Sequence, residues 1–471
     1  MKVSIIGVGA VGGFIAVKLK CAGIPVQLVF KEMSQNHISI NLKIVGNIEA
    51  YANFDDIVTN VAEINGEVIF ICTKSTANDV VFSQLAQLKN KTIVMIQNGI
   101  GEEEKLLSLI HKSNVIIGAI SHIKVSKHAN VITWHNHLSN LNYAFCTNCE
   151  NTHIEYVLKY IFDEVIKEKS VLDLRFQKLL ISASCNGVSV ISQQDMPSMA
   201  KDIKTVKIIT DVGNEVIEVA KAYNVFLSTD KINNLIHALT RSEYRGAYFS
   251  MWYDYNEGKP MELGSIYHNF IEMAKKKNIK VPVTQVIYQQ LERLEKLIIP
   301  VDGVIKLRLL RPCDAESLHQ LKLYNQNHLQ MWFEWANVLM QLQDAVDFIY
   351  FTHQGFLEQK SLILGIFIEN KLIGIVSFNS IHQQTKSAEI GYWLAQDYLG
   401  LGIMTKSVKA LIDYGFHAFD LLDVSISCAV ENKRSQKVAK RLGFQFDMLL
   451  PNHQQVSGNR YDHILYKLNL H

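Results

Sequence analysis

The sequence lacks the features that mark several classes of protein. No apolar run reaches the roughly 18 residues that cross a bilayer, and Met1 and Lys2 lead directly into the strand-like residues 3–6, which leaves no room for a secretory signal. No polybasic block accompanies the net charge of +2, which comes from 47 basic and 45 acidic residues. We therefore expect a cytoplasmic protein that binds neither membranes nor nucleic acid.

Cysteine is scarce and irregularly spaced. Seven cysteines in 471 residues are an odd and scattered set, which predicts reduced thiols. Cys146 and Cys149 form a C-x-x-C, and His122, His128 and two further histidines precede them, so a zinc site is an alternative. A second cysteine pair at zinc-ribbon spacing is missing, and the segment alternates like strands. We predict no metal site.

Three hydrophobic patterns follow one another along the chain. Short apolar runs at residues 3–6, 26–30, 68–72, 93–96 and 115–120 alternate with helical periodicity, which is the pattern of a mainly parallel α/β sheet. Residues 171–297 have long helical periodicity with little Gly or Pro, which predicts an all-α domain. A mixed α+β pattern begins with a strand at 305–310. We expect domains at 1–170, 171–299 and 304–471, with the last join at residues 300–303.

A glycine-rich segment follows the first predicted strand and opens a helix. Its residues are Gly7, Val8, Gly9, Ala10, Val11 and Gly12. Strand, glycines, helix and second strand within one unit of about thirty residues predict a Rossmann dinucleotide site. The first glycine permits the tight turn, the second lets backbone N–H groups approach a pyrophosphate, and the third allows close helix packing.

Lys31 follows the second predicted strand, where NAD enzymes place an acid for the ribose hydroxyls. A cation there favours the 2′-phosphate of NADP(H). Glu32 comes next, and a merely solvated lysine is the alternative.

One predicted helix presents a polar face. Lys178, Ser182 and Asn186 stand four residues apart, so an ammonium, a hydroxyl and an amide lie on one side. A lysine partly withdrawn from water can protonate the alkoxide that forms when hydride reaches a ketone carbon.

With these motifs, the first 300 residues or so resemble the ketopantoate reductase family. The resemblance rests on the glycine segment, Cys72-Thr73-Lys74, Gln97-Asn98-Gly99, the helix of Lys178, and Ser250 followed twelve residues later by Glu262. It implies a Rossmann domain joined to an all-α domain like that of 6-phosphogluconate dehydrogenase. It also implies NADPH-dependent reduction of a 2-oxo acid, with ketopantoate, on the route to pantothenate and CoA, as the leading candidate.

The same resemblance assigns roles to these residues. Lys178 is the catalytic acid, and Glu262 holds the lysine or a substrate hydroxyl. Asn98, Ser182, Asn186 and Ser250 bind the substrate, and Lys74 and Asn98 lie near the cofactor. The sequence also departs from the family, which commonly has Asn at the position of Ser182 and different residues after Glu262, so a 2-oxo acid other than ketopantoate remains an alternative.

The last 168 residues resemble the GNAT superfamily, in particular the acetyltransferases of ribosomal-protein N-termini. Four ordered blocks carry the resemblance, at 389–394, 398–405, 432–435 and 441–444. It implies that acetyl-CoA binds at Leu399, Gly400, Leu401, Gly402, Ile403, Met404 and Thr405, and at Asn432. Two glycines before a helix let N–H groups cradle a pyrophosphate. Leu399 replaces the usual Gln or Arg.

The resemblance also suggests how acetyl transfer proceeds. Ser435 is placed to protonate the leaving thiolate, and the acceptor is an amine or a protein N-terminus. The general base stays open between Glu389 and Asp462, because the related enzymes' acid falls at Gln454, which cannot take a proton. Direct transfer to a deprotonated amine is a further option.

The two halves allow more than one overall interpretation. A bifunctional enzyme is the leading hypothesis. Alternatively, the reductase-like half senses NADP and regulates the acetyltransferase, or the fusion serves only co-expression. The sequence does not fix the oligomeric state, and a homodimer is one option.

Overall fold

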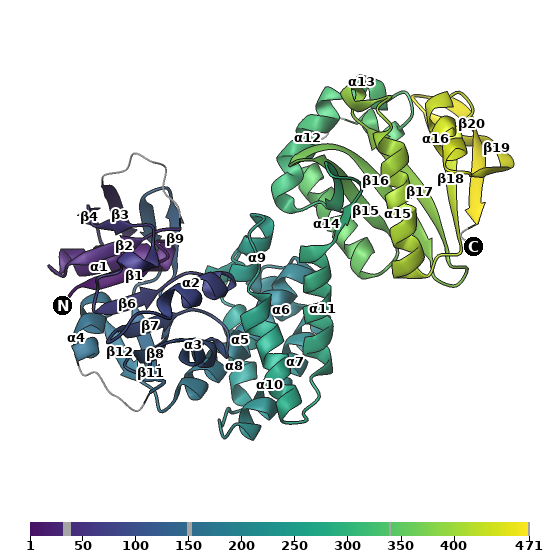
Figure 1. Ribbon diagram of the computed structural model, residues 1–471. Helices are drawn as coiled ribbons and strands as arrows, with labels where there is room; N and C mark the ends of the chain where they lie inside the picture. The colour runs from purple at the N-terminus through teal and green to yellow at the C-terminus, as the bar shows by residue number, and fades with distance from the viewer. Residues whose placement is uncertain (32–38, 148–152, 339–340, 470–471) are drawn as a thin grey trace. The chain divides into compact units, whose positions relative to one another are not determined.

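The computed structural model describes residues 1–31, 39–147, 153–338 and 341–469 (Figure 1). They form two compact units, Met1–Trp252 with Pro260–Gln289, and Tyr253–Lys259 with Gln290–His471. None of the helices in these ranges is long and apolar enough to cross a membrane. The six described cysteines are free thiols, and Cys149 lies outside the described residues.

The first unit is built on an eight-stranded sheet of order β12-β11-β8-β7-β6-β1-β2-β5. Its strands are β1 (Val3–Ile6), β2 (Val26–Val29), β5 (Ile57–Val58), β6 (Val68–Ile71), β7 (Thr92–Ile96), β8 (Val115–Ser121), β11 (Asn140–Phe145) and β12 (Glu164–Lys167). All neighbours pair in parallel except β8 and β11. The predicted, mainly parallel sheet is confirmed.

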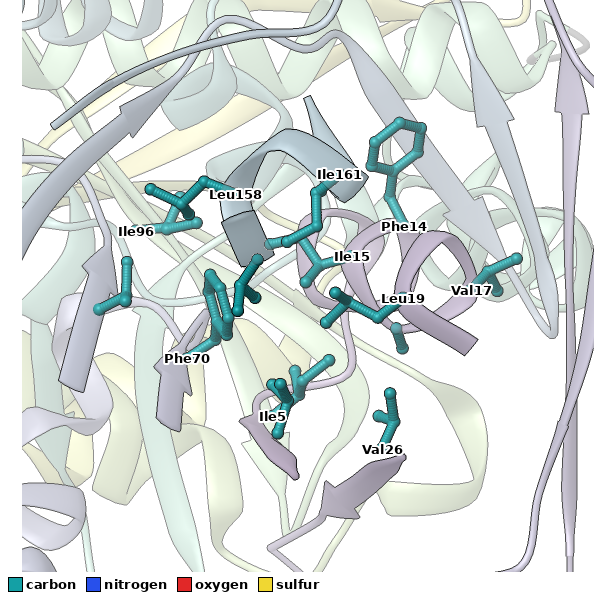
Figure 2. Packing of buried hydrophobic residues seen from close by; sticks show 14 of the residues in the cluster. Ile5, Phe14, Ile15, Val17, Leu19, Val26, Phe70, Ile96, Leu158 and Ile161 are labelled. Carbon is teal, nitrogen blue, oxygen red and sulfur yellow. The ribbon is translucent and has the colours of Figure 1, made fainter. Parts of the chain in front are cut away.

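Helices pack on this sheet through apolar side chains. They are α1 (Ala10–Cys21), α2 (Asn78–Leu85), α3 (Glu102–Leu109) and α4 (His153–Ile161). Figure 2 shows Ile15 and Leu19 of α1 pointing toward Ile5 and Phe70 of the sheet, with Leu158 of α4 beside them. All five side chains are fully buried. This packing fixes the start of α1, and with it the glycine turn, at the end of β1.

A second, four-stranded sheet covers the other side of α1 and was not predicted from the sequence. Its order is β4-β3-β10-β9, with β3 (Ile40–Gly46), β4 (Ala50–Phe54), β9 (Val125–His128) and β10 (Val131–Trp134). Buried Leu42 and Ile132 pack against Gly13 of α1. The sheet brings β9, distant in sequence, to the glycine turn.

The all-α part begins with the 22-residue helix α5 (Val171–Ser192), capped by Ser170, whose Oγ accepts a 3.0 Å hydrogen bond from Asp173 N. Buried Arg175 anchors α5 to the sheet, because its guanidinium donates to Glu103 at 2.8 Å and to the Met95 carbonyl at the end of β7 at 3.2 Å. The remaining helices are α6 (Met196–Lys201), α7 (Ile203–Ala222), α8 (Asp230–Leu239), α9 (Ser250–Asn256), α10 (Asn269–Lys276) and α11 (Pro282–Lys296).

The second unit contains an eight-stranded sheet of order β13-β14-β15-β16-β17-β18-β20-β19. Its strands are β13 (Ile298–Pro300), β14 (Ile305–Leu309), β15 (Leu362–Ile368), β16 (Lys371–His382), β17 (Ser387–Leu394), β18 (Asp423–Ala429), β19 (Gln445–Val456) and β20 (Asn459–Asn469). The helices are α12 (Ala315–Tyr324), α13 (Gln326–Leu329), α14 (Leu342–Leu357), α15 (Ile403–Phe419) and α16 (Lys433–Arg441). The join expected at residues 300–303 falls in the hairpin of β13 and β14.

Candidate active sites

The glycine turn between β1 and α1 has the geometry of a dinucleotide-binding loop. Gly7 has φ +91°, and a Cβ there would lie 2.6 Å from Thr73 N. A Cβ on Gly12 would lie 2.1 Å from the Gly7 carbonyl oxygen, so both positions require glycine. A Cβ on Gly9, by contrast, would meet nothing within 4 Å. The N-terminus of α1 is therefore open for a phosphate at Gly9.

Two lysines lie near the cofactor end of the Rossmann sheet. Lys31, after β2, is exposed, and its neighbour Glu32 lies outside the described residues. Lys127 on β9 was missed by sequence reasoning; its Nζ donates a 2.6 Å hydrogen bond to the Val8 carbonyl within the glycine turn. Burial lowers the pKa of Lys127. No motif signals this lysine, because the unpredicted second sheet brings it there.

Glu262 joins several predicted substrate-site residues. Its side chain is 7% exposed, and Oε1 accepts hydrogen bonds from Ser75 N at 3.0 Å and Ser75 Oγ at 3.1 Å. Oε2 accepts from Asn98 Nδ2 at 3.2 Å. Ser75 directly follows exposed Lys74. The carboxylate is thus fixed beside the loops that follow β6 and β7.

The polar residues that share one face of α5 differ in their hydrogen bonds and burial. Burial lowers the pKa of Lys178, and its ammonium makes no hydrogen bond or ion pair with a described residue. Ser182 Oγ donates back to the Lys178 carbonyl at 3.2 Å, so this hydroxyl is engaged by its own helix. Asn186 is buried, whereas Ser250 at the start of α9 is exposed.

Two further residues at this site were not predicted. His122 follows β8, and its pKa is lowered by burial and by the positive charge of Lys178. Tyr267, one of the departures from the family pattern, is fully buried; its hydroxyl donates to the Ala183 carbonyl at 3.0 Å and accepts from Gly187 N at 2.9 Å. The departure thus has a structural role, holding the segment after Glu262 against α5.

The second unit contains a cavity of about 780 Å³ where two parallel strands separate. The pairing of β17 with β18 ends at Ile390 and Ile426. Beyond that point β17 pairs only with β16, and β18 only with β20. The unpaired strand ends leave room and free backbone groups for an extended ligand arm between them.

The glycine loop before α15 lies at this cavity. Gly400 and Gly402 have φ +81° and +75°, and a Cβ on either would meet nothing within 4 Å. Leu399 and Met404 line the cavity, Ile403 is buried, Leu401 is 65% exposed, and Thr405 Oγ1 accepts from Arg441. The open N-terminus of α15 fits a pyrophosphate.

Asn432 and Ser435 also line the cavity, at the start of α16. Asn432 caps this helix by accepting a 3.1 Å hydrogen bond from Ser435 N. Ser435 Oγ is 2.8 Å from the Tyr392 hydroxyl, and burial raises the pKa of that tyrosine. Cys428, buried on β18, also contacts the Ser435 hydroxyl. The Ser435 hydroxyl is thus positioned at the cavity wall.

Comparison with known families identifies both parts. Residues 3–145 match the family model described as ketopantoate reductase PanE/ApbA, and residues 170–295 match that of its C-terminal part. Residues 305–445 match the acetyltransferase (GNAT) domain. The chain belongs to the ketopantoate reductase family and, in its C-terminal part, to the GNAT acetyltransferases.

Individual proteins support both assignments. The 2-dehydropantoate 2-reductase of a Nostoc species is 25% identical over 62% of this chain and 95% of its own length. The ribosomal-protein-serine acetyltransferase of Escherichia coli is 34% identical over 31% of this chain and 82% of its own length. The crystal structure of 2-dehydropantoate 2-reductase from Geobacter metallireducens has the same fold as the reductase part, with a TM-score of 0.56, 19% identity, and coverage of 62% of this chain and 99% of that one.

The residues present fit the cofactors of the two families, NADPH and acetyl-CoA. In each glycine loop, the space beside Gly9 or Gly402 that a Cβ would occupy is open, so a phosphate can approach the N-terminus of the following helix. In the acetyltransferase domain, Trp332, Phe333 and Trp335 line the cavity. Among the described residues, no three His, Cys, Asp or Glu side chains cluster to hold a metal ion.

The candidates for a general base differ in their surroundings. Glu389 and Gln454 line the cavity, and Gln454 Nε2 donates to the Trp332 carbonyl at 3.3 Å. Asp462 instead accepts a hydrogen bond from Asn452 N at 2.8 Å. His453 and His463, which sequence reasoning missed, also line the cavity. Their positions follow from strand pairing of β19 and β20 and carry no sequence motif.

Proposed function

We propose that the protein is a bifunctional enzyme that reduces a 2-oxo acid with NADPH and transfers an acetyl group from acetyl-CoA to an amine. The observation that carries the reductase proposal is the hydrogen-bonded group of Glu262, Asn98 and Ser75 in the unit that also holds Lys178. The acetyltransferase proposal rests on the cavity between separated strands, with an open glycine loop and Ser435 in or beside its wall.

In the proposed reduction, bound NADPH supplies hydride to the carbonyl carbon. Gly9 and the start of α1 hold the pyrophosphate, and Lys31 pairs with the 2′-phosphate. Lys178 gives its proton to the substrate oxygen. Burial lowers the pKa of Lys178, which makes the ammonium a stronger acid than an exposed lysine.

Glu262 is proposed to accept a hydrogen bond from a substrate hydroxyl. Its donors Ser75 and Asn98 hold the carboxylate in one position before substrate arrives, so less conformational entropy is lost on binding. Asn186 is buried on the helix that carries Lys178, and the amide supplies further polar contacts to an acid.

2-Dehydropantoate, the ketopantoate named above, is the leading candidate substrate, since the Nostoc relative is named 2-dehydropantoate 2-reductase. The test incubates the full-length protein with NADPH and a panel of 2-oxo acids and follows the loss of NADPH absorbance. We expect 2-dehydropantoate to have the highest kcat/KM. A higher kcat/KM for another 2-oxo acid would identify that acid as the substrate instead. No turnover with any of the 2-oxo acids would favour an NADP-binding regulatory role.

The acetyl acceptor is proposed to be a peptide N-terminus, because the Escherichia coli relative is named for acetylating a ribosomal-protein serine. Asn432 binds the pantetheine arm, and Ser435 delivers a proton to the leaving sulfur. Free thiol released from acetyl-CoA is measured with a peptide that begins with serine and with a short diamine. Faster transfer to the diamine would assign a small-molecule acceptor instead.

A further inference from the structure

His463 on β20 is a buried polar residue with one ring nitrogen that no described residue satisfies. The side chain is 7% exposed and lines the acetyltransferase cavity. Its Nδ1 lies 2.9 Å from Ser427 Oγ on the neighbouring strand β18. Its Nε2 is buried and has no hydrogen-bond partner in the described part of the chain. A buried nitrogen without a partner is unfavourable, so a ligand atom is expected to complete it.

The strand geometry separates His463 from the proposed proton donor Ser435. Ser427 and Cys428 are consecutive on β18, so their side chains point to opposite faces of the strand. Ser427 contacts His463, and Cys428 contacts Ser435. An amine that attacks from one side of the strand and a thiolate that leaves on the other would each meet one of these groups.

We propose that His463 is the general base of the acetyl transfer, accepting the proton of the attacking amine at Nε2. The inference rests on the acetyltransferase function proposed above and deepens it. Gln454, at the position where related enzymes carry an acid, has an amide that does not accept a proton, and His463 takes that role from the adjacent strand β20.

The neutral amine nitrogen attacks the thioester carbonyl carbon, and the C–N bond forms while Nε2 of His463 takes the N–H proton. The C–S bond then breaks, and its electron pair goes to sulfur, which receives a proton from Ser435. Ser435 regains a proton from solvent, and His463 returns its proton to solvent. The products are the acetylated amine and coenzyme A.

Ser427 is a positioning residue in this proposal. When Nδ1–H donates to Ser427 Oγ, Nε2 carries the lone pair that a base needs. Burial favours the neutral imidazole, since it lowers the pKa of His463, as does neighbouring His453, while Glu431 raises it. The other titratable or charged side chains in the cavity wall are Lys322, His328, Glu389, Tyr392, Cys428 and Arg434.

The test compares full-length wild type with His463→Gln, which keeps polarity but not the base. The substrates are acetyl-CoA with the serine peptide and with the diamine. We expect kcat/KM to fall by about 10² to 10⁴ with the KM for acetyl-CoA within twofold. Because the base must be neutral, wild-type kcat/KM should fall as pH drops through a pKa below 6.5, and the variant should lack this limb. His417→Gln, on the exposed end of α15, is the matched control.

A readout independent of turnover accompanies the assay. In the CoA-bound protein with labelled histidine, the resonance absent from His463→Gln should titrate below pH 6.5. Ser427→Ala retains the imidazole and should keep the acid limb with a smaller loss of rate. Wild-type rate in His463→Gln, a larger loss in His453→Gln, or a resonance that titrates at or above 6.5 would overturn the proposal while leaving acetyl transfer intact. Absence of transfer to both amines by wild type would overturn the proposed acetyl transfer itself, and the base with it.

Discussion

Asn98 Nδ2 donates a 3.2 Å hydrogen bond to Glu262 Oε2, joining the end of a Rossmann strand to a residue 164 positions later in the chain. The bond ties the loop after β7, in the cofactor domain, to the helical part of the same unit. The geometry of the proposed reductase site therefore depends on how these two segments pack.

Replacing Glu262 with Gln should lower kcat/KM of the reductase by about 10-fold to 100-fold. The amide introduces a donor opposite Ser75 or Asn98, both of which donate to the carboxylate, so the side chain must turn and lose a contact. Steady-state kinetics with NADPH checks this, with Glu218→Gln, at an exposed position of α7, as the control. Unchanged kinetics in Glu262→Gln would show that the Glu262 carboxylate does not contribute to the reductase site.

Reductase turnover should depend on pH through Lys178. The protonated amine is the active form of an acid, so kcat falls as pH rises through the lysine pKa, which burial places below 10.5. A pH profile of kcat in the direction of NADPH oxidation measures this limb. A rate that stays flat up to pH 10.5 would assign proton delivery to another group.

Lys31→Ala should reduce the preference for NADPH over NADH by roughly tenfold, because one charge-assisted contact to the 2′-phosphate is worth about 1.5 kcal/mol or more. Dissociation constants for both cofactors, measured by fluorescence or calorimetry, give the ratio. Lys112→Ala, also exposed on the Rossmann part, serves as the comparison. Equal affinity of the wild type for the two cofactors would contradict the assignment of Lys31.

Gly402→Val should weaken CoA binding at least tenfold. Valine is strained at φ +75°, and its side chain would project into the open space where the pyrophosphate is proposed to approach the loop. Calorimetry of the full chain with CoA measures the effect. Gly458→Val is the matched control, since Gly458 also has a positive φ, +80°, and an added Cβ there also faces open space. Equal affinities in wild type and Gly402→Val would show that the loop does not hold CoA.

Local sequence patterns predicted the regular elements well, because hydrophobic period and glycine position act over short distances. The apolar runs predicted at residues 3–6 and 93–96 coincide with β1 and β7 to within one residue at each end. The sheet formed by β3, β4, β9 and β10 was missed, since its strands are short and half exposed and β10 pairs with β3 across 88 residues. Strand Ile298–Pro300 was not predicted, because the all-α domain was expected to end at residue 299 and the join to begin at residue 300.

The candidate sites divide in the same way. The glycine loops are recognised by residues that lie next to one another in the chain, so the roles of Gly7, Gly12 and Gly402 could be predicted from the sequence alone. Lys127 and His463 could not, because their positions depend on long-range strand pairing. The hydrogen bond from Ser182 Oγ to the Lys178 carbonyl could not be predicted either, since residue spacing gives the face of a helix but not the rotamer of a side chain.

The most direct test of two separate active sites in one chain measures both activities on the same preparations of wild type, Lys178→Ala and Ser435→Ala. Wild type should oxidise NADPH with a 2-oxo acid and release CoA thiol with an amine. In Lys178→Ala the reductase turnover should fall by a factor of about 10² to 10⁴ while acetyl transfer is retained. In Ser435→Ala acetyl transfer should be lost while reduction is retained. Loss of both activities in either variant, or absence of one activity from the wild type, would contradict the account.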